Sequence, residues 1–444
     1  MTKSVPKLTG LPVIGNLLDF SADRLSLLQR VYRELGEVGH VSVLSRQIYI
    51  ATSPDFAQSV LKTHYKKFKK FEALAKFARP ITGNGLLSSE GDLHRRQRRL
   101  IAPGLSRRRI ASYVDIMARY ADEAIGVWQR KGQIDVLTDT NRLTMAIAAS
   151  SMFSSNADTY AKLASHAVDE GTRYLSQEFS RPVHFPYEWP TPRNNRLRRA
   201  IGPLDDVIYG MIRQRRESGE RPDDILSMLL NAQDEDDGKG MSDEQIRDEV
   251  ITLFVAGHET TANALSWALW LLSNNPKIGD TLAEEARSVL DGRPPTFDDL
   301  EHLPLARQAF LETMRLFPPA YMVGRETLED VDIEGWHIPK GAMVLLNIYG
   351  QHHRADFFED PERFEPGRFE GEWEKELPKG AYMPFADGPR VCIGNHFAMM
   401  EGLVVLAHLA QRLRVGEATC SSIEPLARVT LRPKSPFKVM ISTR

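Results

Sequence analysis

The chain has 444 residues, of which 42% are hydrophobic and 26% are charged, a composition typical of a globular protein with an extensive core. Its formal net charge of −2 excludes a global bias towards nucleic acid or an anionic membrane. Two cysteines, Cys392 and Cys420, cannot build a disulfide framework, so we expect a protein of the reducing cytoplasm. No continuous apolar stretch follows Lys3 and Lys7, and the sequence therefore predicts neither a signal peptide nor a membrane anchor.

Helical periodicity dominates the chain. We expect helices over residues 24–35, 54–61, 93–101, 107–130, 141–153, 197–217, 223–231, 251–272, 277–290, 304–317 and 396–411. Strand patterns are fewer: they predict a hairpin over 40–52, a strand over 343–349, and a strand pair formed by 427–433 and 436–442. The acidic run 234–244 is expected to be a solvated loop. The patterns predict a mainly α fold, in a single domain over 1–444, with a small β-rich part from about 36–55, 325–350 and 417–444.

The stretch from Ile251 to Leu272 is about long enough to cross a bilayer. However, polar residues from His258 to Asn263 lie at its middle, and a carboxylate at mid-bilayer is strongly unfavourable. The better interpretation is a long helix through the centre of a large domain, apolar on nearly all sides. A capping box at Ser242 and Gln245 marks its start, and Asn274-Asn275-Pro276 marks its end.

A glycine-rich loop surrounds one of the two cysteines, in the sequence FADGPRVCIGNHFA from Phe385 to Ala398. Glycines allow backbone N–H groups to approach the Cys392 sulfur, and these donors, together with a helix expected from His396, favour the thiolate. A thiolate held in this way is a ligand or a nucleophile. As a nucleophile it would need a base, and His396 is a candidate. Zinc would need more ligands than the loop offers, whereas a metal already held by four ligands, as in haem, needs only one thiolate.

This loop resembles the haem-thiolate signature of the cytochrome P-450 family, Phe-x-x-Gly-x-Arg-x-Cys-x-Gly, and the resemblance extends over nearly the whole chain. The matching residues are Phe385, Gly388, Arg390, Cys392 and Gly394. The resemblance implies the cytochrome P-450 fold, with the long central helix over haem b and Cys392 as the axial iron ligand. It also implies mixed-function oxidation, in which dioxygen and two electrons yield a hydroxylated or epoxidised product.

The second motif is AGHETT, Ala256 to Thr261, inside the central helix. Gly257 costs a helix interior about 1 kcal/mol relative to alanine, and Thr260 can bond back to a carbonyl one turn earlier and bend the helix. A satisfied polar patch in the core would explain a lone threonine, but not an acid–threonine pair next to glycine. The family resemblance implies that Ala256 and Gly257 border the haem, and that Glu259 and Thr260 relay protons to dioxygen.

The third motif is LETMRLFPP, in which Glu312 and Arg315 lie on one helix face. Such a pair is usually a surface ion pair of little energetic value, but the resemblance implies a structural Glu-x-x-Arg pair joined by a further arginine. That partner is expected to be Arg368 of FEPGRF, and not Arg363 of the PERF just upstream. The chain departs from the family pattern at Gly367, where glutamate is usual, and in the HHRA sequence that starts at His352.

The resemblance also implies cationic partners for the two haem propionates, and here these are His94, Arg98, Arg325 and Arg390. The stretch 94–109 around the first two carries seven arginines. It could be a solvated cationic face, but no nucleic-acid-binding motif accompanies it. The family interpretation is that an acidic ferredoxin or flavodoxin, served by its NAD(P)H reductase, docks there.

Pocket walls are expected from residues 71–87, 167–190, 254–255 and 319–323. These segments are rich in Phe, Leu, Met and Val, so we expect an apolar substrate such as a fatty acid, a terpenoid or a macrolide-like polyketide, oxidised by a soluble bacterial enzyme. The alternatives are a peroxide-driven peroxygenase of the same fold, a non-enzymatic haem sensor, and a cysteine hydrolase. Retention of both Glu259 and Thr260 argues against the peroxygenase, because such enzymes tend to lose this pair.

Overall fold

The computed structural model describes residues 3–154, 157–181 and 184–444. Its helices are α1 Leu17–Ala22, α2 Arg24–Leu35, α3 Pro54–Gln58, α4 Glu72–Thr82, α5 Gly91–Ile101, α6 Arg107–Ile110, α7 Val114–Lys131, α8 Val136–Phe153, α9 Ala157–Ser180, α10 Pro192–Ser218, α11 Ile225–Asn231, α12 Asp243–Asn274, α13 Pro276–Leu290, α14 Pro304–Leu316, α15 Ile348–His352, α16 Trp373–Glu376 and α17 Asn395–Arg412. The strands are β1 Lys3–Ser4, β2 Val38–Val43, β3 Arg46–Ala51, β4 Phe68–Lys70, β5 Gln133–Asp135, β6 Val323–Thr327, β7 Val331–Ile333, β8 Trp336–Ile338, β9 Met343–Leu346, β10 Leu413–Ala418, β11 Pro425–Ala427, β12 Leu431–Pro433 and β13 Lys438–Thr443.

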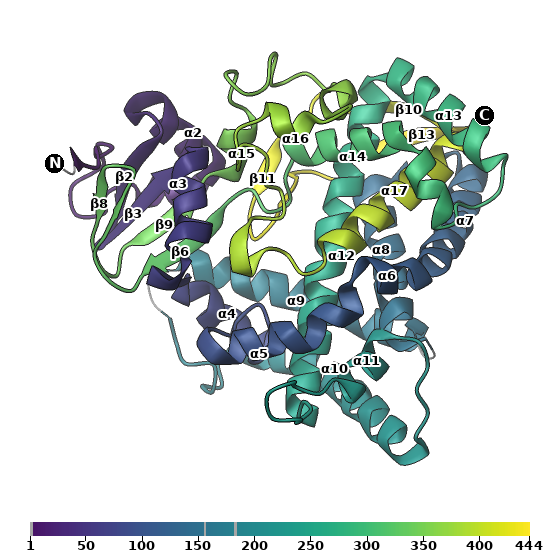
Figure 1. Cartoon of the computed structure of the whole chain (residues 1–444), viewed down its shortest axis with the longest axis horizontal. Helices are drawn as coiled ribbons and strands as arrows, with labels where there is room; N and C mark the ends of the chain where they lie inside the picture. Colours follow the sequence, from purple (N-terminus) through teal and green to yellow (C-terminus); the bar gives the residue numbers. More distant parts are fainter. Residues whose placement is uncertain (1–2, 155–156, 182–183) are drawn as a thin grey trace.

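The main sheet has the strand order β2-β3-β9-β6-β4 and lies at the end of the molecule that holds the N-terminus (Figure 1). The predicted hairpin is confirmed, with β2 and β3 antiparallel and His40 opposite Tyr49. β3 then pairs in parallel with β9, whose four residues are all buried. The predicted strand over 343–349 stops at Leu346, because the Asn347 side chain accepts a hydrogen bond from the Gly350 N–H and begins α15.

The C-terminal strands pair differently from the prediction. Residues 427–433 and 436–442 do not pair with each other: β12 pairs antiparallel with β11, and β13 pairs with β10 and with β5. The reason is a tight turn after Ala427, where the Arg428 N–H donates to the Thr430 carbonyl at 3.2 Å and folds the segment back on itself. Residues 417–444 therefore form sheets separate from the one built by 36–55 and 325–350.

The long central helix is confirmed as α12, Asp243–Asn274. Its capping box is present, since Ser242 Oγ accepts from the Gln245 N–H at 3.2 Å and Gln245 Oε1 accepts from the Ser242 N–H at 3.1 Å. The helix packs against α8, α14 and α17 and is buried along most of its length (Figure 1). Among the described residues, no helix is both long and apolar enough to span a membrane. The acidic run before α12 is a loop, as predicted.

Two further helices, α4 and α9, occupy segments that the sequence indicated only as pocket walls. The predicted helix over 107–130 is interrupted, because α6 passes through a short 3-10 turn at Ala111–Tyr113 before α7 begins. Residues of α4, α8, α9 and α12, together with β6, β9 and the loop before α17, line the cavity described below.

Candidate active site

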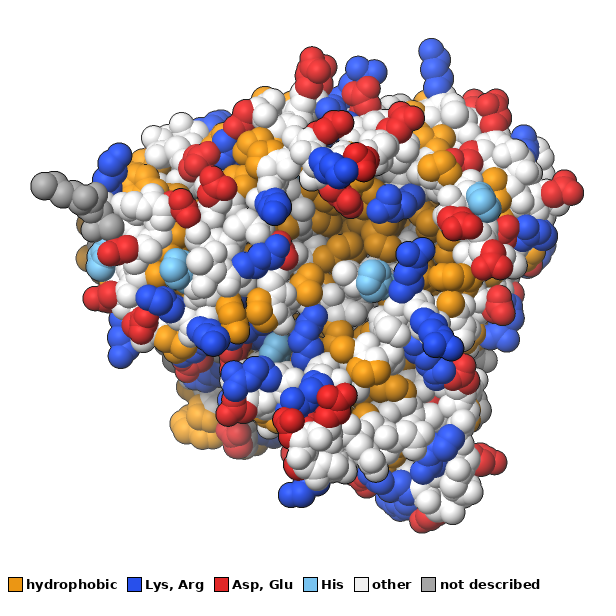
Figure 2. All heavy atoms as spheres, in the orientation of Figure 1, with side chains coloured by type: hydrophobic (Ala, Val, Ile, Leu, Met, Phe, Trp, Pro, Cys, Tyr) orange, Lys and Arg blue, Asp and Glu red, His pale blue; other side chains and the backbone are white. Residues whose placement is uncertain are grey.

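A cavity of about 1440 Å³ lies between α12 and the loop that leads into α17. Figure 2 shows that this face of the molecule is hollowed, with apolar side chains at the bottom of the hollow and Lys and Arg side chains around it. The predicted site residues that line the cavity are Ala256, Gly257, Glu259, Thr260, Arg325, Phe385, Arg390, Cys392 and Gly394. The structure thus brings together three segments of the chain that are distant in sequence.

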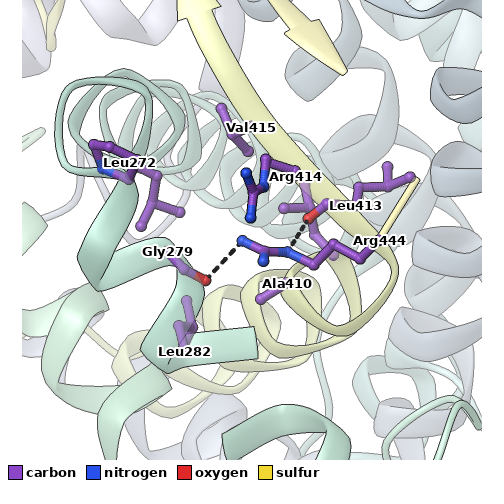
Figure 3. A pocket seen from close by; sticks show the side chains of 10 residues that line it. Leu272, Gly279, Leu282, Ala410, Leu413, Arg414, Val415 and Arg444 are labelled. Atoms are coloured by element: carbon purple, nitrogen blue, oxygen red, sulfur yellow. Dashed lines mark hydrogen bonds between the residues drawn. The ribbon is translucent and has the colours of Figure 1, made fainter. Parts of the chain in front are cut away.

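A second pocket, near the C-terminus, has a free volume of only about 10 Å³, because a protein side chain fills it (Figure 3). Arg444 extends across it and donates to the Gly279 carbonyl at 3.0 Å and to the Leu413 carbonyl at 3.1 Å. The same side chain pairs with Asp280 at 2.6 Å. These bonds fasten Arg444 to α13 and to the start of β10, so this pocket is structural and the larger cavity is the candidate site.

Cys392 lies at the tip of the loop before α17, where its N–H donates to the Phe385 carbonyl at 3.0 Å. Gly388 has a φ of +73°, and a Cβ there would come within 2.0 Å of the Leu61 carbonyl oxygen, so only glycine fits. The Cys392 side chain is exposed, but to the cavity and not to bulk solvent. Burial raises the pKa of its thiol against the opposing effects of the Gly394 N–H and the Arg98 charge. The N–H donor thus acts in the predicted direction, but burial outweighs it and keeps the thiol pKa above its usual value, so a bound metal ion would have to displace the proton.

The AGHETT segment of α12 faces the cavity through an open groove. Ala256 and Gly257 line it, and a Cβ added to Gly257 would meet no atom within 4 Å. The Thr260 hydroxyl donates to the Ala256 carbonyl at 2.7 Å, which is the expected bond to the preceding turn. Glu259 Oε1 accepts a hydrogen bond of 2.8 Å from Thr430, a residue that the sequence analysis did not single out. The acid and the alcohol therefore lie side by side at the open part of the helix.

Three cations gather at one side of the cavity: Arg325 and Arg390, as predicted, and Lys70, which the sequence analysis missed. Burial and the two neighbouring arginines lower the pKa of Lys70 to about 7. Burial and Arg390 lower the pKa of Arg325 to about 10. Glu90 is a nearby acid, and it pairs with Arg390 at 2.7 Å. The cluster has more buried positive charge than it can pair internally, which favours a bound anion.

The other two predicted propionate partners do not line the cavity. His94 is buried beside the cation cluster, and burial together with Lys70 and Arg390 lowers its pKa to about 4. The Arg98 guanidinium donates to the Val391 carbonyl at 2.8 Å, next to Cys392. In this structure Arg98 supports the cysteine loop, and His94 lies behind the cations that face the cavity.

The buried Glu-x-x-Arg pair is present on α14. Arg315 binds Glu312 through two hydrogen bonds of 2.6 and 2.9 Å, and both side chains are inaccessible to solvent. Arg368 Nε lies 3.4 Å from Glu312 Oε1, whereas the Arg363 side chain is 66% exposed and approaches Glu365 at 3.9 Å. Arg368 therefore occupies the position expected of the third partner, and the departure at Gly367 does not displace it.

The basic stretch 94–109 is less free than its sequence suggests. Arg96 and Arg99 both pair with Asp234 of the acidic loop, and Arg109 pairs with Asp223. Where Figure 1 places α5, Figure 2 shows Lys and Arg side chains mixed with Asp and Glu. Within the described part of the chain, Arg107 and Arg108 have no ion pair and are exposed. The charge of this stretch that is both unpaired and exposed is thus concentrated at the start of α6.

The expected pocket walls are largely present, with two corrections. Phe71, Phe77 and Leu87 line the cavity, as do the segments around α9 and β6. Phe254 does not line it, because its side chain is buried in the core, where it stacks on His258. Tyr321 does not line it either, since its hydroxyl turns away and donates to the Arg428 carbonyl at 2.8 Å.

The residues around the cavity fit a haem group. One thiol faces α12 across the cavity, and the groove at Gly257 leaves space above it. Arg390 Nε is buried and has no hydrogen-bond partner among the described residues. Two carboxylates placed at this side would pair with Arg390, Arg325 and Lys70 and remove the charge imbalance. The donor set therefore matches a planar group that carries a metal at its centre and two acids at its edge.

Comparisons with known proteins point to the same group. The family model for Cytochrome P450 matches residues 5–441. Cyclooctatin synthase of Streptomyces melanosporofaciens is 34% identical over 95% of this chain and 92% of its own length. Cyclooctat-9-en-7-ol 5-monooxygenase of the same organism is 35% identical over 86% of this chain and 83% of its own length. Pentalenene oxygenase of Streptomyces avermitilis is 30% identical over 98% of this chain and 96% of its own length.

The fold agrees with these matches. The crystal structure of the cytochrome P450DA heme domain superimposes with a TM-score of 0.90, at 24% identity, and covers 100% of this chain and 98% of that one. The family match extends over the whole length in which the cysteine loop, the α12 groove and the buried Glu312–Arg315 pair occur. The chain therefore belongs to the cytochrome P450 family, and it is a haem-thiolate monooxygenase.

Proposed function

We propose that this monooxygenase hydroxylates or epoxidises an apolar terpenoid, using haem b, dioxygen and two electrons from a ferredoxin or flavodoxin with its NAD(P)H reductase. The observation that carries the proposal is the large cavity, which is lined mainly by apolar side chains and contains Cys392, Glu259 and Thr260. Two of the relatives named above carry terpene-derived names and align with at least 92% of their length. This supports a terpenoid over the other candidates, a fatty acid or a polyketide.

Bound haem supplies the activation of dioxygen, and the residues of the chain determine where it happens. Cys392 would bind the haem iron, and Lys70, Arg325 and Arg390 would hold the propionates; all four residues line the cavity. The apolar walls from α4 and from residues 319–323 exclude water and hold the substrate by shape. Glu259 and Thr260 border the open groove, where a carboxyl and a hydroxyl can pass a proton inwards.

The redox partner is proposed to dock at the exposed Arg107 and Arg108, near the start of α6. α6 packs against α17, the helix that follows the cysteine loop. An acidic protein would be steered to unpaired positive charge at this place, with a rate that falls as salt rises.

The test begins with purified protein carrying haem. The carbon monoxide difference spectrum of the reduced protein should show the strongly red-shifted Soret band of thiolate ligation. The Cys392→Ser variant should fold and lose both this band and turnover, because an alcohol is a poor substitute for the thiolate donor. Normal turnover and an unchanged spectrum in that variant would overturn the assignment of Cys392.

The substrate class is tested with pentalenene and with fatty acids of similar size, first by the spectral shift on binding and then by product analysis with a ferredoxin and ferredoxin reductase. Oxidised pentalenene and unchanged fatty acids are expected. Turnover of the fatty acids alone would refute the terpenoid proposal. Turnover with hydrogen peroxide but not with the reductase system would favour the peroxygenase.

A further inference from the structure

Glu259 is held from outside its own helix. Thr430, in the turn between β11 and β12, donates its hydroxyl proton to Glu259 Oε1 at 2.8 Å. The Asn263 side chain, one turn further along α12, donates to the same hydroxyl oxygen at 3.1 Å. Asn263 and Thr430 are 2% and 8% exposed, so water does not compete freely for these bonds.

The direction of this chain of hydrogen bonds follows from the donors available. The Asn263 amide nitrogen can only donate, so the Thr430 hydroxyl must accept at that side. A hydroxyl has a single proton, and this proton is then directed to Glu259 Oε1. The arrangement fixes one carboxylate oxygen as an acceptor, and Oε2, which has no described bond, stays available to a partner in the cavity that Glu259 lines.

The turn that carries Thr430 is itself fastened to the cavity wall. The Leu431 N–H donates to the Pro319 carbonyl at 2.9 Å, and Tyr321 donates to the Arg428 carbonyl at 2.8 Å. Arg428, Val429 and Thr430 all line the cavity, and Val429 is 37% exposed there. A molecule in the cavity would therefore contact the same turn that orients the acid.

We propose that Thr430 is a positioning residue for the Glu259 carboxyl, and that the turn Arg428–Thr430 couples occupation of the cavity to the orientation of this acid. The inference rests on the proposed role of Glu259 in proton delivery. It adds a residue from a distant strand turn to the acid–alcohol pair. Contact of substrate with Val429 moves or stiffens the turn, and Thr430 transmits this to Glu259.

Other titratable groups also act on Glu259, and their influence must be distinguished from that of the Thr430 hydroxyl. Arg432 on β12 interacts electrostatically with Glu259, and so does His258 on α12. Asp169 of α9 acts on both of these groups. Removing the Thr430 hydroxyl changes none of these charges, so a threonine substitution separates the two hydrogen bonds of this hydroxyl from the charge effects.

The decisive variant is Thr430→Val, which keeps the shape of the side chain and removes the hydroxyl. Thr430→Ser restores the donor. Thr313→Val is the matched control, because Thr313 is a buried threonine on α14 whose hydroxyl donates to Ala309 within its own helix. The first measurement is infrared spectroscopy of the haem-loaded protein and needs no turnover. The carboxyl band that disappears in Glu259→Gln is assigned to Glu259.

This band should shift in Thr430→Val and stay in place in Thr430→Ser and Thr313→Val. In urea unfolding, Thr430→Val should lower the midpoint less in a Glu259→Leu background than in the parent, because one of the two bonds it removes, the bond to Glu259, is already gone there. An unshifted band, or equal midpoint losses in both backgrounds, would overturn the proposal. Neither result depends on which substrate the enzyme takes.

The second measurement uses turnover. With a saturating concentration of a terpenoid that gives a binding spectrum, Thr430→Val should form about three- to tenfold more hydrogen peroxide per product than the parent, and Thr430→Ser should restore the parent ratio. Binding of that terpenoid should shift the Glu259 band in the parent and not in Thr430→Val. If no terpenoid is oxidised, the proposed function fails while the infrared and unfolding results still decide the role of Thr430.

Discussion

Glu312 and Arg315 form an ion pair that no solvent reaches, with Arg315 Nε 2.6 Å from Glu312 Oε2. Arg315 uses its remaining N–H groups on the carbonyls of His352, Pro361 and Arg363. Glu312 in turn accepts the Glu365 N–H at 3.0 Å. The pair thus joins α14 to the segment 352–365 and satisfies backbone groups that would otherwise be buried without partners.

Breaking this pair should markedly lower the free energy of unfolding. Glu312→Gln leaves the Arg315 charge buried and uncompensated, which costs about 3–5 kcal/mol. The matched control is Glu372→Gln, because Glu372 pairs with Lys375 on the surface with both side chains more than 70% exposed, where a loss of about 0–1 kcal/mol is expected. Urea unfolding measures both, and equal losses would contradict the structural role of the buried pair.

Two nearby arginines, Arg368 and Arg363, are candidates for the third partner of the pair, and substitution distinguishes them. Arg368→Gln should destabilise the protein more than Arg363→Gln, because Arg368 is 13% exposed beside Glu312 and Arg363 is 66% exposed. The difference in unfolding midpoint between the two variants tests the assignment directly. A larger effect at Arg363 would reverse it.

Thr260→Ala should leave haem content and substrate binding close to normal while uncoupling the reaction. Alanine removes a hydroxyl that, among the described residues, bonds to carbonyls of its own helix, at Ala256 and Gly257, so packing changes little. The loss is directed proton delivery, for which a positioned acid–base group contributes roughly 10²–10⁴-fold. Per NAD(P)H consumed, the amount of oxidised product should fall and the amount of hydrogen peroxide should rise. Thr260→Ser should restore the parent ratio, and tight coupling in the alanine variant would show that Thr260 is not in the proton path.

Motifs with short, fixed spacings were predictable from the sequence. The cysteine loop, the capping box at Ser242 and the Glu312–Arg315 pair each lie within about ten residues, and local geometry determines their contacts. Arg368 was predictable only because the family resemblance linked it to a motif more than 50 residues earlier. Its place beside Glu312 follows from the loop that Arg315 holds.

Lys70 and Thr430 were not predictable in the same way. Lys70 lies on an edge strand, and nothing nearby in the sequence marks it as a partner of Arg390, which is 320 residues away. Thr430 contacts Glu259 only because a turn folds β12 back on β11, and the alternating pattern of 427–433 indicated one strand without that turn. Strand pairing depends on distant segments, so period-2 alternation alone does not specify the partner.

Electron transfer should depend on Arg107 and Arg108. Changing both to alanine should slow reduction by an acidic ferredoxin and flatten its dependence on salt, because these arginines have no ion pair within the described residues. The charge-matched control changes Arg142 on α8 and Lys277 on α13. Stopped-flow reduction at several ionic strengths compares the two. An equal effect of both double variants would show that only net charge matters, and not this site.

Arg96 and Arg99 should behave differently from Arg107 and Arg108. They hold Asp234 of the loop before α12, at 3.3 and 2.7 Å. Their removal should loosen that loop, which hydrogen exchange over residues 232–242 would detect. The sequence treats all seven arginines of 94–109 alike, and the structure separates the paired ones from the free ones.

Acid should destabilise the protein through two buried histidines on and next to α15. Burial lowers the pKa of His352 to about 3 and that of His353 to about 4, from an ordinary value of 6.5. The unfolded chain therefore binds more protons than the folded one between pH 6.5 and 4, so stability is full above pH 6.5 and falls as the pH is lowered. Each histidine should contribute a loss of about 2 kcal/mol between pH 7 and pH 5.

His353→Phe removes one of these two groups and keeps the ring that stacks on Tyr349 at 4.1 Å between centroids. It also removes the bond from Nδ1 to the Tyr349 carbonyl, so its stability at pH 7 should fall below that of the parent. The informative quantity is therefore the change between pH 7 and pH 5, measured by urea unfolding at each pH. That change should be smaller by about 2 kcal/mol in His353→Phe and unaltered in His302→Gln, whose side chain is 66% exposed. An unchanged difference in His353→Phe would mean that His353 is not the neutral buried base that its surroundings require.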